Sequence, residues 1–250
     1  PFLYLLAGSL TEASYYRSVG VSFSPAHWSI ASYRLLLGAS SRIYGALRVS
    51  LFLSGVGTAV SLVTTAALAY GLSRKEVPGR NVIVFLVFFT MLFGGGMVPF
   101  YLVVKGLGLI DSLWSLILPW AVNVWYMVIM IKFFESLPVD LVDAARIDGC
   151  GEMGIFVRIV LPLSRPVLAT MALFFAVDYW NEWFWPTIFL TNDQLYPLQL
   201  VLRGILSQLL QVMNPRAAVD AAKMRTVVPP PVEVLRMASI IVTVLPITLV

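Results

Sequence analysis

Four long apolar stretches constrain this sequence more than any other feature: residues 49–72, 82–104, 113–133 and 167–190. A helix needs roughly 20 apolar residues to cross the hydrocarbon core of a bilayer, and each stretch is long enough. Only 12% of the residues are charged, about half of the fraction that is usual in a soluble domain. The sequence therefore predicts an all-α protein, a polytopic bundle of transmembrane helices.

Two further apolar segments, residues 1–10 and 232–250, are interpreted as parts of a first and a last span, both truncated here. A cleaved signal peptide is the alternative for residues 1–10, but no charged n-region supports it. The interpretation gives six spans with both true ends cytoplasmic, and it treats residues 1–250 as one transmembrane domain. The glycines at 94–96 are predicted to break the 82–104 span, which requires contact with protein or a water-filled cavity at that depth.

The distribution of positive charge sets the predicted orientation. Residues 73–81 (SRKEVPGRN) carry three basic side chains against one carboxylate, and such an excess marks a cytoplasmic loop. Counting spans from this loop places residues 135–166 in the cytoplasm and residues 191–231 outside. Within the outer segment, residues 198–212 predict an amphipathic helix.

The cytoplasmic segment 135–166 mixes charged and apolar residues and predicts two short helices. The first is predicted to begin near Pro138, because proline is tolerated in the first turn of a helix, and to end at Asp148-Gly149. The second carries an apolar stripe that includes Phe156, and it is predicted to stop at Pro162. Two short helices at an angle, displayed outside a membrane, are typical of a docking element.

This segment resembles the EAA loop of the permeases of binding-protein-dependent ABC importers. The resemblance rests on residues 143–149 (DAARIDG), on Phe156 and on the ending LPLSRP at 161–166. Asp143 stands where the pattern usually has glutamate, which keeps the carboxylate. The stretches FGGGMVPFYLVVKGLGLIDSLWSLILP, WNEWFWPTIFL and YPLQLVLRGIL are similar to MalG-like carbohydrate permeases, and most of all to the branch that serves oligosaccharides released from polysaccharides.

The resemblance implies the MetI-like permease fold and a transport function without enzyme activity or a cofactor in this chain. The implied partners are a second permease subunit, two ATP-binding subunits that bind ATP and Mg²⁺, an extracytoplasmic solute-binding protein and the lipid of a bacterial cytoplasmic (inner) membrane. Closure of the ATPase would drag the two short helices and rock the spans from inward-open to outward-open. The residues implied in ATPase coupling are Asp143, Ala144, Ala145, Asp148, Gly149, Phe156 and Pro162.

A second candidate site is the polar and aromatic run DYWNEWFWP at residues 178–186. Ionisable groups inside a span usually face a cavity or a partner, and aromatic faces beside hydrogen-bonding groups suit sugar rings. The alternatives are an aromatic belt at the outer interface for the tryptophans and helix-to-helix hydrogen bonds for the polar residues. The substrate-pathway candidates are Tyr179, Trp180, Asn181, Glu182 and Trp183.

The charge and the rare residues exclude several function classes. The net charge of +4 is small and scattered, so no nucleic acid partner is expected. The chain has one histidine and one cysteine, which leaves no paired His or Cys ligands for a metal site and makes a membrane-embedded enzyme hard to support. There is no P-loop. An ion-coupled secondary transporter and an ABC permease for a non-sugar solute stay as alternatives.

The charge of the sugar is left open by the sequence. Four basic residues of the outer segment raise the hypothesis of contact with an acidic binding protein or an acidic sugar such as a uronate oligomer, and a solvated loop is the alternative. These residues are Arg203, Arg216, Lys223 and Arg225.

Overall fold

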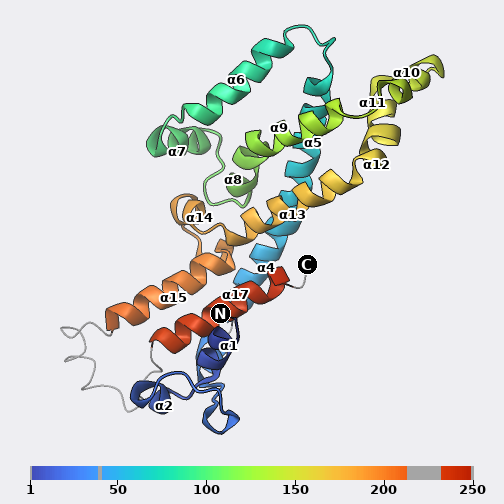
Figure 1. Cartoon of the computed structure of the whole chain (residues 1–250). Coiled ribbons are helices and arrows are strands. Elements are labelled where there is room, and N and C mark those ends of the chain that lie inside the picture. The colour runs from blue at the N-terminus through green and yellow to red at the C-terminus, as the bar shows by residue number, and fades with distance from the viewer. Residues whose placement is uncertain (1, 39–40, 213–231, 249–250) are drawn as a thin grey trace. The chain divides into compact units, whose positions relative to one another are not determined.

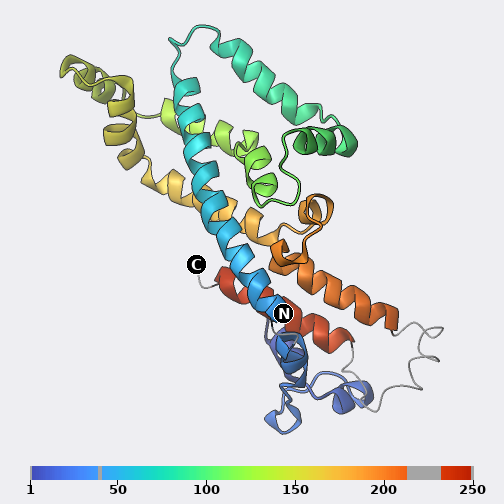
Figure 2. The same cartoon turned by 180° about the vertical axis from the view of Figure 1, so that it is seen from behind.

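The computed structural model describes residues 2–38, 41–212 and 232–248. Regular structure in these ranges is helical, and an isolated antiparallel bridge joins Thr11 and Trp28 (Figure 1, Figure 2). The chain divides into two compact units. We call Leu51–Asn181 with Ile188–Thr191 the bundle unit, and Pro1–Ser50 with Glu182–Thr187 and Asn192–Val250 the terminal unit.

One unbroken helix and three bent helix pairs in the described ranges are long and apolar enough to cross a membrane. The unbroken helix is Arg42–Ser73, with 32 residues. It consists of α4 (Ser41–Phe52), the π-helical turn η2 (Leu53–Gly57) and α5 (Thr58–Ser73). If each bent pair is one span, the total is four, by length and composition. The count of six spans stays a prediction.

The three bent pairs differ in how sharply they turn. The pair α6 (Arg80–Leu92) and α7 (Met97–Gly106) turns by 118°, at the glycines where the sequence predicted a break. The helices α8 (Trp114–Ile117) and η3 (Leu118–Trp120) meet α9 (Val124–Glu135) at 46°. The third pair joins α11 (Glu152–Ile155), η4 (Phe156–Val160) and α12 (Leu161–Leu163) to α13 (Arg165–Asn181) at 82°.

Two predicted boundaries in the third pair were wrong. Pro162 does not stop the second short helix, which runs on to Leu163 and bends at Ser164. Pro162 lies near the C-terminal end of one continuous helix, Glu152–Leu163, which therefore ends one residue later than predicted. The span predicted at 167–190 is not one helix either, because α13 ends at Asn181 and the short α14 (Phe184–Phe189) follows. Pro186 explains this second break, since a proline ring clashes with the carbonyl four residues before it.

The core of the bundle unit lies where α5 packs against α9 and α13. Small residues on α5, Ala66 and Ala69, are buried and allow close approach. Polar side chains of α5 also reach the break before α9, where the Thr64 hydroxyl donates to the Ala121 carbonyl at 2.5 Å. Buried members of this core are Ala66, Ala69, Tyr70, Leu72, Met127, Met130, Ile131, Phe134, Val142, Ala145, Ile155, Val160 and Met171.

The terminal unit packs its helices around α17 (Val232–Thr248). It also contains α1 (Phe2–Leu10), α2 (Ala13–Ser18), η1 (Pro25–His27), α3 (Ala31–Gly38), η5 (Asp193–Leu195) and α15 (Leu198–Val212), together with most of α4 and of α14. The amphipathic helix predicted at 198–212 is confirmed with these bounds. The rest of the predicted outer loop, residues 213–231 with Arg216, Lys223 and Arg225, lies outside the described residues.

Candidate functional site

The segment predicted to couple to an ATPase folds as two short helices joined by a tight turn. Helix α10 (Val139–Ile147) begins directly after Pro138 and is followed by Asp148. Gly149 has φ +81°, a left-handed conformation that glycine adopts without steric penalty. The N–H of Cys150 donates to the Ala145 carbonyl at 2.9 Å and the N–H of Gly149 to the Arg146 carbonyl at 3.0 Å. These two bonds form a Schellman motif, which ends α10 and redirects the chain into α11.

The two faces of α10 have different surroundings. Val142 and Ala145 are buried against the core of the bundle unit. Asp143, Ala144 and Ile147 are exposed, and Ile147 keeps 85% of its surface. The adjacent alanines therefore do not share one contact surface: Ala145 packs within this chain, whereas Ala144 lies beside the exposed carboxylate. Figure 1 and Figure 2 show α10 and α11 at one end of the bundle unit.

The remaining coupling candidates divide in the same way. Phe156 is half-buried, and its ring lies 4.8 Å from that of Tyr70 on α5, so it anchors α11 and η4 to this chain's own core. Asp148 and Pro162 are exposed. The structure thus leaves an outward surface made of Asp143, Ala144, Ile147 and Asp148, with Gly149 at the turn.

Sequence reasoning missed a charged cluster behind this surface. Arg146 and Glu152 lie on consecutive helices of the segment, and Tyr70 and Glu76 come from α5 and the loop that follows it. The hydrogen bond from Arg146 lowers the pKa of the Glu152 carboxyl, and the one from Tyr70 lowers it further. Both residues of the Arg146–Glu152 pair are visible in the sequence, but no local pattern connects them with Tyr70.

The substrate-pathway candidates mostly contact their own chain. Tyr179 and Trp180 are 6% and 5% exposed, and the Asn181 amide donates to the Val177 carbonyl at 3.0 Å. Glu182 Oε1 accepts the backbone N–H groups of Phe184 at 2.8 Å and of Trp185 at 3.1 Å. It thereby satisfies two N–H groups at the start of α14, as a helix cap does.

Trp183 is covered by a cation from α15. The guanidinium carbon of Arg203 lies 3.4 Å from the centroid of the Trp183 ring. Arg203 was a candidate for contact with an acidic sugar or binding protein, and here it stacks on an aromatic ring of the same unit. This cation–π contact holds α15 to the segment at the start of α14.

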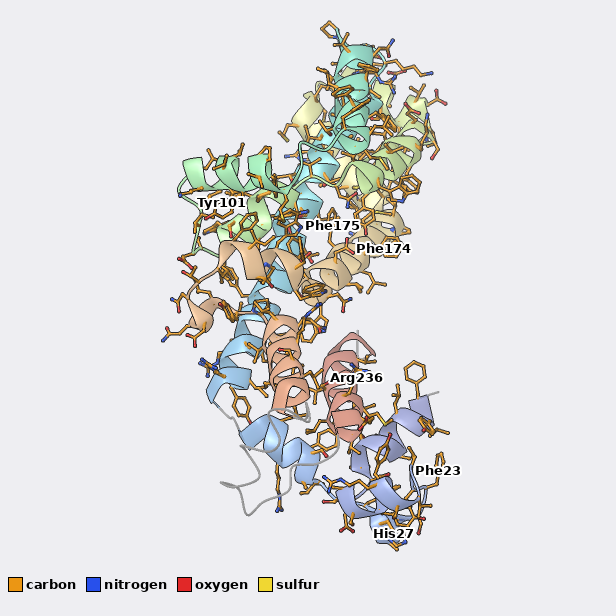
Figure 3. All side chains as sticks on the ribbon, turned by 90° about the vertical axis from the view of Figure 1, so that its left-hand side faces the viewer. Phe23, His27, Tyr101, Phe174, Phe175 and Arg236 are labelled. Carbon is orange, nitrogen blue, oxygen red and sulfur yellow. The ribbon has the colours of Figure 1, made fainter. Side chains whose placement is uncertain are left out.

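An exposed polar and aromatic stripe runs along α13 beside its buried residues. Phe174 and Asp178 are exposed, whereas Phe175 and Tyr179 are buried; Figure 3 labels the two phenylalanines. Tyr126 of α9 donates its hydroxyl to Asp178 Oδ2 at 2.8 Å, and its ring lies 5.7 Å from that of Phe174. Asp178 was part of the run noted in the sequence, but Tyr126 was missed because it lies 52 residues earlier.

This stripe has a carboxylate acceptor beside two aromatic rings. A carboxylate in contact with lipid would be unfavourable by about 2.5–3.5 kcal/mol, so the face belongs against protein or a water-filled path. Among the described residues, no group of three or more His, Cys, Asp or Glu side chains is placed to hold a metal ion.

Bent apolar helices of membrane-spanning length, with an exposed two-helix turn, are typical of a polytopic membrane protein. Residues 67–250 match the family described as "Binding-protein-dependent transport system inner membrane component". The matched range includes the whole two-helix turn. The chain belongs to this family.

Similar proteins extend the match to the entire chain. It is 41% identical over 250 residues to the polygalacturonan/rhamnogalacturonan transport system permease protein YtcP of Bacillus subtilis, covering 100% of this chain and 85% of that protein. It is 40% identical over 247 residues to protein LplC of the same organism, covering 99% and 81%. The crystal structure of a bacterial ABC transporter that imports the acidic polysaccharide alginate contains a similar chain, with a TM-score of 0.87, 27% identity, and coverage of 100% and 86%. The predicted family and the helical permease fold are confirmed.

Proposed function

We propose that this chain is the permease subunit of an ATP-driven importer and that it conducts an oligosaccharide derived from an acidic polysaccharide across the inner membrane. The observation that carries this proposal is the 41% identity over the whole chain to a permease of polygalacturonan/rhamnogalacturonan transport. The likeness to a chain of an alginate importer supports the same class of substrate.

ATP hydrolysis belongs to separate subunits in this proposal. The exposed surface of α10, with Asp143, Ala144, Ile147 and Asp148, is where such a subunit would dock. Ala144 lets the partner approach closely, Ile147 offers an apolar contact of large area, and the two carboxylates pair with basic groups. A second permease subunit and an extracytoplasmic solute-binding protein complete the proposed assembly.

The stripe on α13 is the proposed contact with the sugar. Sugar rings have apolar faces and rims of hydroxyl groups. The exposed ring of Phe174 is suited to an apolar sugar face. Asp178 Oδ1 has no hydrogen-bond partner among the described residues, so it is free to accept a sugar hydroxyl. Of the five earlier candidates at 179–183, Tyr179 and Trp180 are buried, so they do not line this pathway.

Uptake by the reconstituted importer tests the proposal. The chain is purified with its native partners and placed in vesicles that enclose ATP, and labelled oligogalacturonate is added outside with the solute-binding protein. We expect accumulation that requires ATP and exceeds that of a neutral arabino-oligosaccharide of equal length. Equal uptake of the neutral sugar would contradict the acidic substrate class. Accumulation in vesicles that contain this chain alone would favour an ion-coupled transporter.

A further inference from the structure

We propose that Arg146 is a positioning residue that ties the coupling helices to the adjacent end of α5, so that their movement enters the bundle at α5 as well as along the chain. The inference rests on the proposed function of the two-helix turn as the ATPase-coupling element. It adds a route of force transmission that chain connectivity does not provide.

Arg146 joins three carboxylates from different parts of the bundle unit. Its Nη2 and Nε donate to Glu152 Oε1 at 2.8 and 3.0 Å. The same Nη2 lies 3.3 Å from Glu76 Oε2, in the loop after α5, and Nη1 lies 3.6 Å from Asp143 Oδ1. The forked guanidinium suits this task, because it can bind several oxygens at fixed angles.

Glu152 carries the link onward to α5. Its second oxygen, Oε2, accepts the Tyr70 hydroxyl at 2.8 Å. Each oxygen of this one carboxylate therefore holds a different partner, one on α10 and one on α5. Tyr70 is 8% exposed. Its ring packs in the core, and its hydroxyl therefore holds the Glu152 carboxylate at a fixed place on α5.

The Tyr70 side chain is held from two further sides. Arg74 Nη2 donates to the Tyr70 hydroxyl at 3.0 Å, and the Arg74 guanidinium carbon lies 4.5 Å from the ring centroid. The Phe156 ring packs against the same ring at 4.8 Å. The attachment is thus polar at the hydroxyl and apolar at the ring, and both parts connect the coupling segment to α5.

The chain itself connects the coupling helices only to α9, through residues 136–138, and to α13, through residue 164. Helix α5 lies far away in sequence, and it forms the membrane-length helix Arg42–Ser73 together with α4 and η2. Movement of α10 and α11 reaches this long helix through Tyr70 and Glu76. The cluster around Arg146 adds a polar link there, beside the apolar contact of Phe156 with Tyr70.

The stability of the fold depends little on this cluster, although the proposed transmission of movement does depend on it. Exposed ion pairs contribute little to stability because water screens them, and the side chains of Arg146, Glu76 and Glu152 are 36%, 71% and 54% exposed. Val142, Ala145 and Phe156 hold the segment to the core without them. Variants of Arg146 are therefore expected to fold and to assemble.

The test compares Arg146→Gln with wild type in the complete importer reconstituted in vesicles. We expect the amount of sugar transported per ATP hydrolysed to fall about fivefold, within the range typical of coupling between distant sites, while the ATP-binding subunits co-purify normally. Glu152→Gln and Tyr70→Phe should act in the same direction. The double variant Arg146→Gln/Glu152→Gln should be no worse than Arg146→Gln alone, since both changes break one network.

Arg158→Gln is the matched control. Arg158 is an exposed arginine of the same segment, and no carboxylate of the described residues pairs with it. Its removal changes the charge equally and should leave the ratio of sugar to ATP unchanged.

Hydrogen exchange reports the proposed route directly. In wild type, trapping the importer with a non-hydrolysable ATP analogue should alter amide exchange at residues 66–73 and at residues 165–170. In Arg146→Gln the change at 66–73 should be reduced, whereas the change at 165–170 should persist in full; an undiminished change at 66–73 would contradict the proposed route.

Each outcome decides between the two proposals. If the wild-type importer hydrolyses ATP but moves no oligosaccharide, the proposed function fails. If wild type transports and Arg146→Gln transports as much sugar per ATP, the positioning role fails. Loss of the ATP-binding subunits from Arg146→Gln would also overturn it, because Arg146 would then be a docking residue.

Discussion

Gly57 lies against the ring of Tyr179 where η2 crosses α13, so closely that a Cβ at position 57 would be 2.7 Å from the ring carbon Cζ. The Tyr179 hydroxyl is within 2.8 Å of the Ser61 hydroxyl, one helical turn further along the same helix. A large ring thus fits onto the long helix only because residue 57 has no side chain. This crossing fixes two membrane-length helices against each other.

The first prediction concerns this crossing. Gly57→Ala should destabilise the purified protein by about 1–3 kcal/mol, because overpacking a buried contact forces the ring or the helix to move. Thermal unfolding of the purified complex measures the effect. Gly55→Ala is the control, since position 55 is in the same turn and a Cβ there would meet nothing within 4 Å. Equal unfolding temperatures for the two variants would disprove the close packing.

The turn between α10 and α11, the helices proposed to couple to the ATPase, gives the second prediction. Gly149→Ala requires an alanine at φ +81°, a conformation that is unfavourable by about 1–2 kcal/mol for residues with a Cβ. We expect less sugar transported per ATP, with the protein still inserted in the membrane, and a stronger effect for Gly149→Pro. Gly151→Ala is the matched control because Gly151 has an ordinary φ of −72°. Unchanged coupling in Gly149→Pro would remove the turn from the mechanism.

The third prediction separates two roles of Glu182. Glu182→Ala should lower the stability of α14 by about 1 kcal/mol, through the loss of an acceptor for two backbone N–H groups. Glu182→Gln keeps that acceptor and should restore stability. Thermal unfolding and uptake are measured for both variants. If Glu182→Gln is stable but transports poorly, the carboxylate itself acts in the pathway, as the sequence first indicated.

The helical class and the turn between α10 and α11 could be predicted because each depends on local sequence. Apolar length gives the spans, and Asp148-Gly149 gives the end of α10 with a left-handed glycine. The angles at the broken spans could not be predicted, since a proline or glycine marks a weak point and packing sets the bend. The helix that contains Pro162 ends one residue after it, at Leu163, and the chain then turns by 82° into α13.

The candidate site was predictable in part for the same reason. Residues 179–183 stand out in the sequence as polar and aromatic. In the helix, however, Tyr179 is buried and Asp178 is exposed. The sequence alone does not show which face of this apolar helix is buried. The partners Tyr126 and Tyr70 lie far from their carboxylates along the chain. Such pairs become visible only when α9 and α5 are packed beside the segments they contact.

The last prediction concerns Asp178, the exposed carboxylate on α13. If it accepts a sugar hydroxyl, Asp178→Asn should raise the substrate concentration needed for half-maximal uptake about tenfold, as expected when a hydrogen bond to a charged group is lost. Phe174→Ala should act in the same direction by removing the exposed ring. Tyr126→Phe should have a smaller effect, because it removes the donor that orients the carboxylate but keeps the ring.

Uptake kinetics in vesicles, measured beside co-purification of the second permease, distinguish a sugar contact from an interface between subunits. Asp193→Asn is the control: Asp193 is also an exposed carboxylate, and it pairs with Arg42 in the terminal unit. The sugar contact requires that Asp178→Asn assemble fully and bind substrate more weakly. If instead the second permease is lost from the complex, Asp178 pairs with a basic group of that subunit, and the stripe is an interface rather than a part of the sugar's path.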